Sequence, residues 1–223
     1  MAVSKNLNTT ARLGLLCALS WTEKYFVRQG HSSCRYPKGM TLEEVANDTA
    51  DAITHLDASR KAFGSFQPGV GPCGEPQLVN FIAEYLNGLP KYRKAALTKR
   101  TPDLLVPGEW ALEFKIVRPF GDNAREAENW SVNLLHPYPG NVSSIGDCLK
   151  LLQWTGREQR AVIVIGYEHI PQRIDLTPLV KSFELIAEHV MDIHLSARVE
   201  CRREGLIHPV HQALRLFAWQ VGE

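Results

Sequence analysis

The 223-residue sequence lacks a strong excess of charge of either sign, because 25 lysines and arginines face 24 aspartates and glutamates and the formal net charge is +1. Composition alone therefore does not indicate a nucleic-acid-binding surface. No apolar run approaches the roughly 20 residues of a membrane-spanning helix, so we expect no membrane partner. The apolar stretch LGLLCALSW is short and no convincing cleavage site follows it, which favours a helix of the mature protein over a signal peptide.

Cysteine is also scarce, with five residues and no Cys-x-x-Cys spacing. An odd number without paired spacing argues against a disulfide framework or a cysteine zinc site and indicates a reducing cytoplasm. The Gly-rich stretch GSFQPGVGPCGEP lacks the spacing of a nucleotide-binding loop. No two histidines have the His-x-x-x-His spacing of a helical metal site, so we predict no metal role for the histidines near the C-terminus: His189, His194, His208 and His211.

The stretch PDLLVPGEWALEFK, residues 102–115, contains two apolar runs separated by a Pro-Gly turn signal. Branched and aromatic residues on both sides of such a turn predict a β-hairpin. Side chains alternate along a strand, so Glu113 and Lys115 should share one face while Trp110 and its alternating apolar neighbours take the other. If Val106 pairs with Trp110 across the turn, Asp103 lies opposite Glu113 with Cβ atoms roughly 5 Å apart.

Two opposed carboxylates repel each other unless something neutralises them. A divalent cation such as Mg²⁺ would do so, since it takes oxygen ligands from one or two carboxylates and leaves positions for water and phosphate. Lys115 on the same face could orient a water or help to deprotonate it, which together predicts a site for phosphodiester hydrolysis. The alternative is a solvated hairpin whose charged residues face water, and the apolar flanks weigh against it.

Pro102-Asp103 followed by Glu113-Phe114-Lys115 resembles the PD-(D/E)xK nuclease superfamily, which includes many type II restriction endonucleases, Holliday-junction resolvases and repair nucleases. The resemblance covers about residues 75–168. It implies an α/β fold, restriction-endonuclease-like, with a mixed β-sheet flanked by helices. It also implies hydrolysis of DNA that depends on Mg²⁺, for which Mn²⁺ can substitute, and it suggests a type II restriction or phage-defence endonuclease acting on double-stranded DNA as a homodimer in the cytoplasm.

The resemblance also assigns roles to residues. It implies that the metal is held by Asp103, Glu113, the backbone carbonyl of Phe114 and Glu75, and that Lys115 positions the attacking water. Glu75 opens the amphipathic segment EPQLVNFIAEYLNGL, which predicts a helix with proline at its first position. Glu84 in the same helix is the competing acid, and an acid at a helix N-terminus can also simply complement the helix dipole.

The segments around the hairpin match the order that the resemblance implies, with one departure. Downstream, SSIGDCLKLLQW predicts a helix that begins at Ser144 with Asp147 in a capping-box-like start, and residues 161–165 predict a buried strand. Residues 118–142 form a long irregular insertion between them. The family usually has another strand before the Pro-Asp, where this chain offers only KYRKAALTKRT, so that strand is short, displaced or absent.

Five residues are candidate contacts to nucleic acid: Lys150, Gln153, Arg118, Lys99 and Arg100. The last two belong to a basic segment just before the motif, which could contact phosphates. The same segment could instead be a solvated helix end with cations near the C-terminal dipole.

Domain boundaries follow the Gly- and Pro-rich stretch near residue 70. We expect an N-terminal helical region, residues 1–70, with helices at 9–29 and 41–62 that pack on the core, and a nuclease-like core, residues 71–223. A helix from Thr177 and two C-terminal strands should extend the sheet. Two other functions stay open: a nucleic-acid-binding or assembly subunit that keeps the fold without cleavage, and an RNA-directed nuclease.

Overall fold

The computed structural model describes residues 39–63, 67–92, 94–98, 100–138 and 142–222, so the expected helix at 9–29 lies outside the described residues. The described helices are α1 (Leu42–Ala58), α2 (Glu75–Gly88), α3 (Val132–Leu135), α4 (Ser144–Leu152) and α5 (Thr177–Leu185), with a 3-10 turn at Pro90–Tyr92 and a π-helical turn at Ile186–Val190. The strands are β1 (Ala96–Leu97), β2 (Leu104–Val106), β3 (Trp110–Val117), β4 (Gln159–Glu168), β5 (Val199–Glu204) and β6 (Ala213–Gln220).

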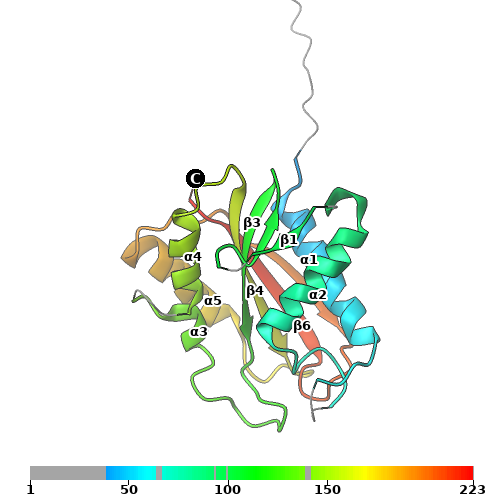
Figure 1. The fold of residues 1–223 in the computed structure, drawn as a ribbon. Helices are drawn as coiled ribbons and strands as arrows, with labels where there is room; N and C mark the ends of the chain where they lie inside the picture. The colour runs from blue at the N-terminus through cyan, green and yellow to red at the C-terminus, as the bar shows by residue number, and fades with distance from the viewer. Residues whose placement is uncertain (1–38, 64–66, 93, 99, 139–141, 223) are drawn as a thin grey trace, which may run out of the picture. The chain divides into compact units, whose positions relative to one another are not determined.

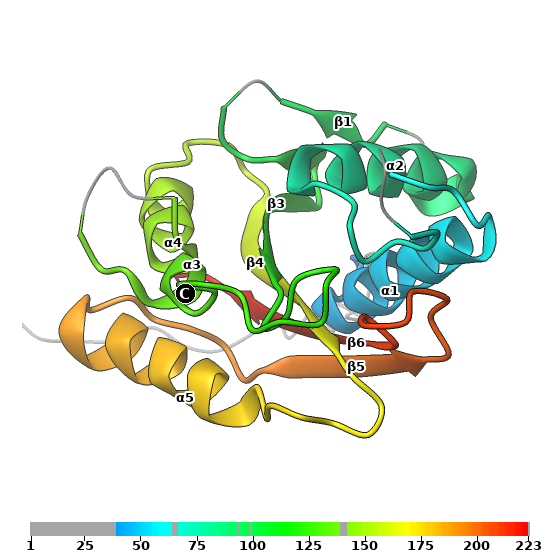
Figure 2. The ribbon, with the colours of Figure 1, turned by 90° about the horizontal axis from the view of Figure 1, so that it is seen from below.

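The strands form one open, mixed sheet in the order β1-β2-β3-β4-β6-β5. β3 and β4 are parallel, and every other neighbouring pair is antiparallel. Helices α1 and α2 cover one face of the sheet, while α3, α4 and α5 lie on the other (Figures 1 and 2). The expected mixed α/β fold with a sheet flanked by helices is confirmed at this level.

The hairpin predicted around the Pro-Gly turn is formed by β2 and β3. Val106 pairs with Trp110 and Leu104 with Leu112, which is the expected register. Gly108 has φ +78° in the turn, a backbone conformation that glycine adopts without steric cost. Asp103 directly precedes β2, and this register places it opposite Glu113.

β3 is buried along its whole length because helices pack against both faces of the sheet. Trp110, Leu112 and Phe114 belong to the hydrophobic core under α1 and α2. Ala111 and Val117 belong to the second core, under α4 and α5. The expected alternation is confirmed, and it means that the charged residues of β3 lie inside the protein rather than in water.

The helix starts show which capping patterns were read correctly. At α1, the Thr41 hydroxyl accepts from the Glu44 backbone N–H at 3.2 Å and the Glu44 carboxylate accepts from the Thr41 N–H at 2.8 Å, as the capping box predicts. α4 begins at Ser144 as predicted, but the expected capping pattern of Ser144 with Asp147 is wrong, because Ser143 is the cap and accepts from the Gly146 N–H at 3.1 Å. Asp147 lies in the first turn of α4 and is buried.

The strand expected before the Pro-Asp is present but short, since β1 has only two residues. At the other side of the sheet, β6 pairs with β4 and β5 forms the edge, so the C-terminal strands extend the sheet as predicted. Helix α1 contacts α2, β5 and β6 and belongs to the same compact unit as the rest of the described chain. Of the helices in the described ranges, none is both long and apolar enough for a bilayer crossing.

Candidate active site

The candidate site lies at the edge of β3 that β2 leaves uncovered. β2 pairs only as far as Leu112, so the next N–H groups on that edge need other acceptors. The Asp103 carboxylate accepts from the Phe114 N–H at 2.9 Å, and the Glu75 carboxylate accepts from the Ile116 N–H at 3.0 Å. The two acids thus take the place of the strand residues that would pair beyond Leu112. The carbonyl of Phe114 points to the same edge of β3 as its N–H.

Glu113 is the most perturbed acid of this group. Its side chain points to the face of β3 under α4, the residue is 3% exposed, and its Oε1 atom has no hydrogen-bond donor among the described residues. Burial, the neighbouring Asp103 carboxylate and the charge of Asp147 raise the pKa of Glu113 to about 9. The Asp103 carboxyl lies within hydrogen-bonding reach of Glu113. A proton or a cation between the two carboxyls would relieve their repulsion.

Lys115 is held between two carboxylates. Its Nζ lies 3.1 Å from Glu75 Oε1 and 3.3 Å from Asp147 Oδ2. Burial disfavours the charged form of Lys115, but the carboxylates of Asp147 and Glu75 outweigh it and raise the pKa of the ammonium group above its usual value. Lys115 is thus a fixed cation beside the carboxyl pair and not a proton acceptor in this arrangement.

Asp147 is a site residue that the sequence interpretation missed. It is 1% exposed and binds two lysines, because Lys150 Nζ donates to its Oδ1 at 2.7 Å while Lys115 lies at Oδ2. Burial of Asp147, Cys148 and Leu151 defines the inner face of α4. Asp147 and Leu151 are four residues apart and so lie on one face of α4, which was the signal in the sequence for this position.

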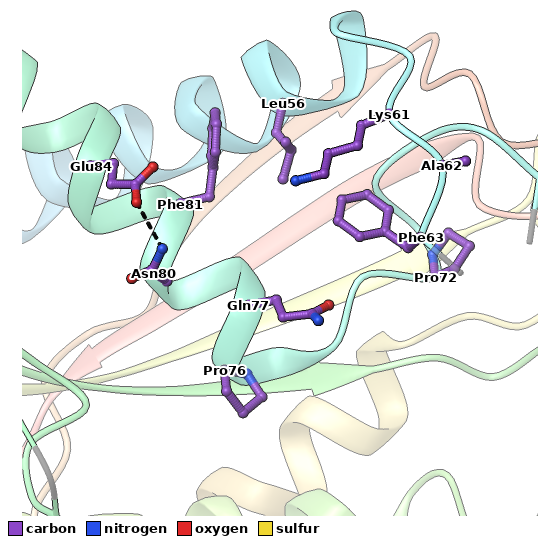
Figure 3. Close-up of a pocket in the computed structure, with 10 residues that line it drawn as sticks. All are labelled: Leu56, Lys61, Ala62, Phe63, Pro72, Pro76, Gln77, Asn80, Phe81 and Glu84. Carbon is purple, nitrogen blue, oxygen red and sulfur yellow. Dashed lines mark hydrogen bonds between the residues drawn. The ribbon is translucent and has the colours of Figure 1, made fainter. Parts of the chain in front are cut away.

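Two hollows flank the first turn of α2. The smaller, of about 160 Å³, is bordered by Glu75, Pro76 and Asp103, so solvent reaches the acids at the β3 edge. The larger, of about 750 Å³, lies on the other side of that turn, where Pro76 and Gln77 form part of its wall (Figure 3). The two hollows therefore lie next to each other at the start of α2.

Two of the other predicted site residues, Glu84 and Gln153, lie away from the carboxyl pair. Glu84 lies nine residues along α2 from Glu75, about 14 Å at 1.5 Å per residue, and accepts from the Asn80 amide at 2.8 Å. Glu75 is therefore the helical acid at the site. Gln153 ends α4 on a different side from Asp147, as helical geometry requires for a six-residue separation.

The basic residues likewise differ in their position. Lys150 binds Asp147 and keeps 43% of its side chain exposed, so it can still meet an anion. The Arg118 guanidinium donates to the Cys73 carbonyl and lies over the Tyr167 ring, so it is used inside the protein. Arg100 is exposed, and Lys99 lies outside the described residues.

A second cluster of polar residues lies near the end of β3. Asp122, His208 and His211 have ligand atoms within 4.8 Å of one another, and they are the only such group of three found in the described ranges. However, His208 Nδ1 accepts from the N–H groups of Val210 and His211 at 3.2 and 3.3 Å, which places the ring proton on Nε2. A protonated Nε2 has no lone pair for a metal, so this cluster is a poor metal site.

Comparisons with protein-family models, with curated proteins and with solved structures find no significant match for this chain. The chemistry of the candidate site rests on its residues alone. Asp103 and Glu113 offer oxygen donors that fit a hard divalent cation such as Mg²⁺, and the Glu113 oxygen without a donor is an available ligand atom. Glu75 is already used by Lys115 and by the β3 edge, so its carboxylate would have to exchange partners to join the ligands.

Proposed function

We propose that the protein is a Mg²⁺-dependent nuclease that hydrolyses phosphodiester bonds in DNA. The observation that carries the proposal is the Asp103–Glu113 carboxyl pair with the Lys115 ammonium fixed beside it by Glu75 and Asp147. An ion pair that only stabilises the fold would not need two acids opposite each other. The repulsion between Asp103 and Glu113 destabilises the protein, and a bound cation would remove it.

The order of elements supports the same proposal. A helix that begins at Glu75 is followed by a short strand, a hairpin with Asp103 and Glu113, the helix α4, and a strand parallel to β3. This order is the one that the resemblance to the PD-(D/E)xK nucleases implies. The short β1 accounts for the departure noted in the sequence.

The chain's own residues have distinct roles in this reaction. Asp103 and Glu113 would hold the ion, with the Phe114 carbonyl as a further ligand. When bound, Mg²⁺ supplies Lewis-acid stabilisation of the charge that develops on the phosphate. Lys115 would bring a positive charge to the attacking water and a phosphate oxygen, and it remains protonated because two carboxylates hold it. Lys150, half-exposed beside Asp147, would bind a non-bridging phosphate oxygen.

Incubation of plasmid DNA with Mg²⁺ or with EDTA tests the proposal, with the parent compared with Asp103→Asn and Lys115→Ala. We expect metal-dependent cutting by the parent and a loss of at least a hundredfold in each variant, as for removal of a group that stabilises charge. Glu43→Gln is the matched control, because this acid is exposed in the first turn of α1, away from the carboxyl pair, and should leave cutting unchanged.

The outcomes separate the alternatives. Cutting by all variants would remove these residues from the mechanism. Cutting of single-stranded RNA but not of DNA would identify an RNA-directed nuclease, and binding of DNA without cutting would identify a binding subunit. If both strands of a duplex are cut, we propose a homodimer with two such sites, which sedimentation at the assay concentration would detect.

A further inference from the structure

The larger hollow beside α2 is a groove of about 750 Å³ between the end of α1 and one side of α2. This volume lies within the range of about 300 to 1,000 Å³ that is typical of small-ligand sites. In Figure 3, the rings of Phe63 and Phe81 stand on different sides of the groove, and the Gln77 side chain extends from α2 below Phe63 in this view. The groove thus has the volume of a small-ligand site and an aromatic ring on two of its sides.

The side chains that border the groove offer the contacts that an unpaired nucleobase uses. Phe63 and Phe81 are only partly buried, so each has ring surface available for stacking. His55 stacks on Phe81 with ring centroids 6.3 Å apart and an interplanar angle of 20°, which holds that ring in place. Stacking on aromatic side chains is the main sequence-independent contact of single-stranded nucleic acid.

Polar groups complete the groove. The Lys61 ammonium lies 5.6 Å from the centroid of the Phe63 ring and provides a cation for a phosphate. The Gln77 amide can reach a base edge, since an amide both donates and accepts. The one acid, Glu84, is at the far end from Lys61 and accepts from Asn80, so it does not oppose a phosphate at the cationic end (Figure 3).

The groove lies next to the smaller hollow, which Asp103 of the carboxyl pair borders. Pro76 borders both hollows, and Glu75, which precedes it, holds Lys115. Phe81 is five residues further along α2, about 7.5 Å at 1.5 Å per residue. A strand whose phosphate lies at the acids would therefore bring a base only one or two nucleotides away to the groove.

We propose that this groove binds an unpaired base of the nucleic-acid strand, next to the phosphate at the Asp103–Glu113 pair. The inference rests on the proposed nuclease function and narrows its substrate to DNA with at least one unpaired nucleotide at the cleavage point. In an intact duplex the bases are stacked and paired, so a base can enter the groove only from a single-stranded, frayed or branched region.

Binding, measured apart from cleavage, tests this inference. Fluorescence anisotropy with a labelled single-stranded oligonucleotide and with a blunt duplex of the same sequence would be carried out in Mg²⁺ on the Lys115→Ala background, which prevents cutting under the proposed mechanism. We expect Phe63→Leu and Phe81→Leu each to weaken single-strand binding by about fivefold to a hundredfold and to leave duplex binding unchanged. Phe81→Tyr, which keeps a ring, should bind like the background protein.

Leu185→Ala on α5 is the matched control, because this exposed side chain lies in the helix layer on the other face of the sheet. A photoreactive oligonucleotide containing 5-iodouracil gives an independent readout that needs no variant. Its crosslinks should map by mass spectrometry to Phe63 or Phe81.

Equal single-strand affinities for the leucine, tyrosine and control variants, with crosslinks elsewhere, would overturn the inference. Tight binding of a free mononucleotide with the same dependence on the phenylalanines would overturn it too, because the groove would then be a free-nucleotide site. If blunt duplex is cut, and is still cut after both leucine substitutions, base binding in the groove is refuted and the nuclease proposal stays intact. Ring-dependent strand binding without any cutting by the parent would support the groove and refute hydrolysis.

Discussion

Replacing Glu113 by glutamine tests the protonation state of the carboxyl pair. In the folded, metal-free protein, burial and the charges of Asp103 and Asp147 raise the pKa of Glu113 to about 9, against 4.5 for an unperturbed glutamate. At pH 8 the folded protein therefore holds this side chain as a neutral acid while the unfolded chain holds it ionised. Glu113→Gln keeps the shape and removes the ionisation.

The sign of the effect follows from the proton balance. Between pH 4.5 and about 9 the folded state binds more protons at Glu113 than the unfolded state, so the free energy of unfolding falls as the pH rises. One such group gives a slope of at most about 1.4 kcal/mol per pH unit, or roughly 2 kcal/mol between pH 7.0 and 8.5. The stabilising contribution is complete below the unfolded pKa and is lost as the pH rises through the folded pKa.

The pH window of 7.0 to 8.5 isolates this group from other shifted groups. Burial lowers the pKa of His169, His208 and His211, and that effect removes stability as the pH falls below about 6.5. Burial raises the pKa of Cys73 to about 11 and also that of Cys148, so the thiols lower stability only near and above their unfolded pKa of 9.0.

Urea unfolding in EDTA at several pH values across this window measures the slope. We expect the parent to lose roughly 2 kcal/mol and Glu113→Gln to lose much less, so that the variant is the more stable protein at pH 8.5. Glu43→Gln is the control, because this glutamate is exposed at the start of α1 and should keep the slope of the parent. Parallel slopes for all three proteins would refute the account of a protonated Glu113.

Three further substitutions test other contacts. Asp147→Asn removes one of the two acids that hold Lys115 and should cost about 2 kcal/mol in urea unfolding; an unchanged stability would contradict a buried ion pair. The Asp57 carboxylate accepts from two backbone N–H groups, each at 2.8 Å. Asp57→Ala leaves both groups without an acceptor and should lower the free energy of unfolding by about 3 kcal/mol in the same assay. Gly166 lies on the buried strand β4, and Gly166→Ala would place a Cβ 2.4 Å from Leu176 Cδ1. The melting temperature should fall, because the clash lowers the free energy of unfolding by about 1–3 kcal/mol. An unchanged melting temperature would show that Leu176 moves aside.

The sequence predicted the hairpin and its register because both follow from local rules. The Pro-Gly turn determines which residues pair, and the alternation of side chains then places Asp103 and Glu113 opposite each other. The start of α1 was equally predictable, since a Thr-x-x-Glu capping box uses only neighbouring residues.

Contacts between distant segments could not be predicted in this way. Asp147 reaches Lys115 because α4 packs against β3, and the spacing of residues within α4 does not determine that packing. The use of Glu75 as an acceptor for the edge of β3 depends on where β2 ends. The inward position of Arg118 depends on the Cys73 carbonyl, 45 residues earlier in the chain.

Titration calorimetry with Mn²⁺, which can replace Mg²⁺ at oxygen ligands, tests the central claim most directly. At pH 8 the parent should bind an ion with release of about one proton per chain, seen as a dependence of the binding heat on the ionisation enthalpy of the buffer. Asp103→Asn and Glu113→Gln should abolish this binding, and Asp122→Asn in the second cluster should retain it. Binding that survives the first two substitutions and is lost in Asp122→Asn would contradict a metal site at the carboxyl pair.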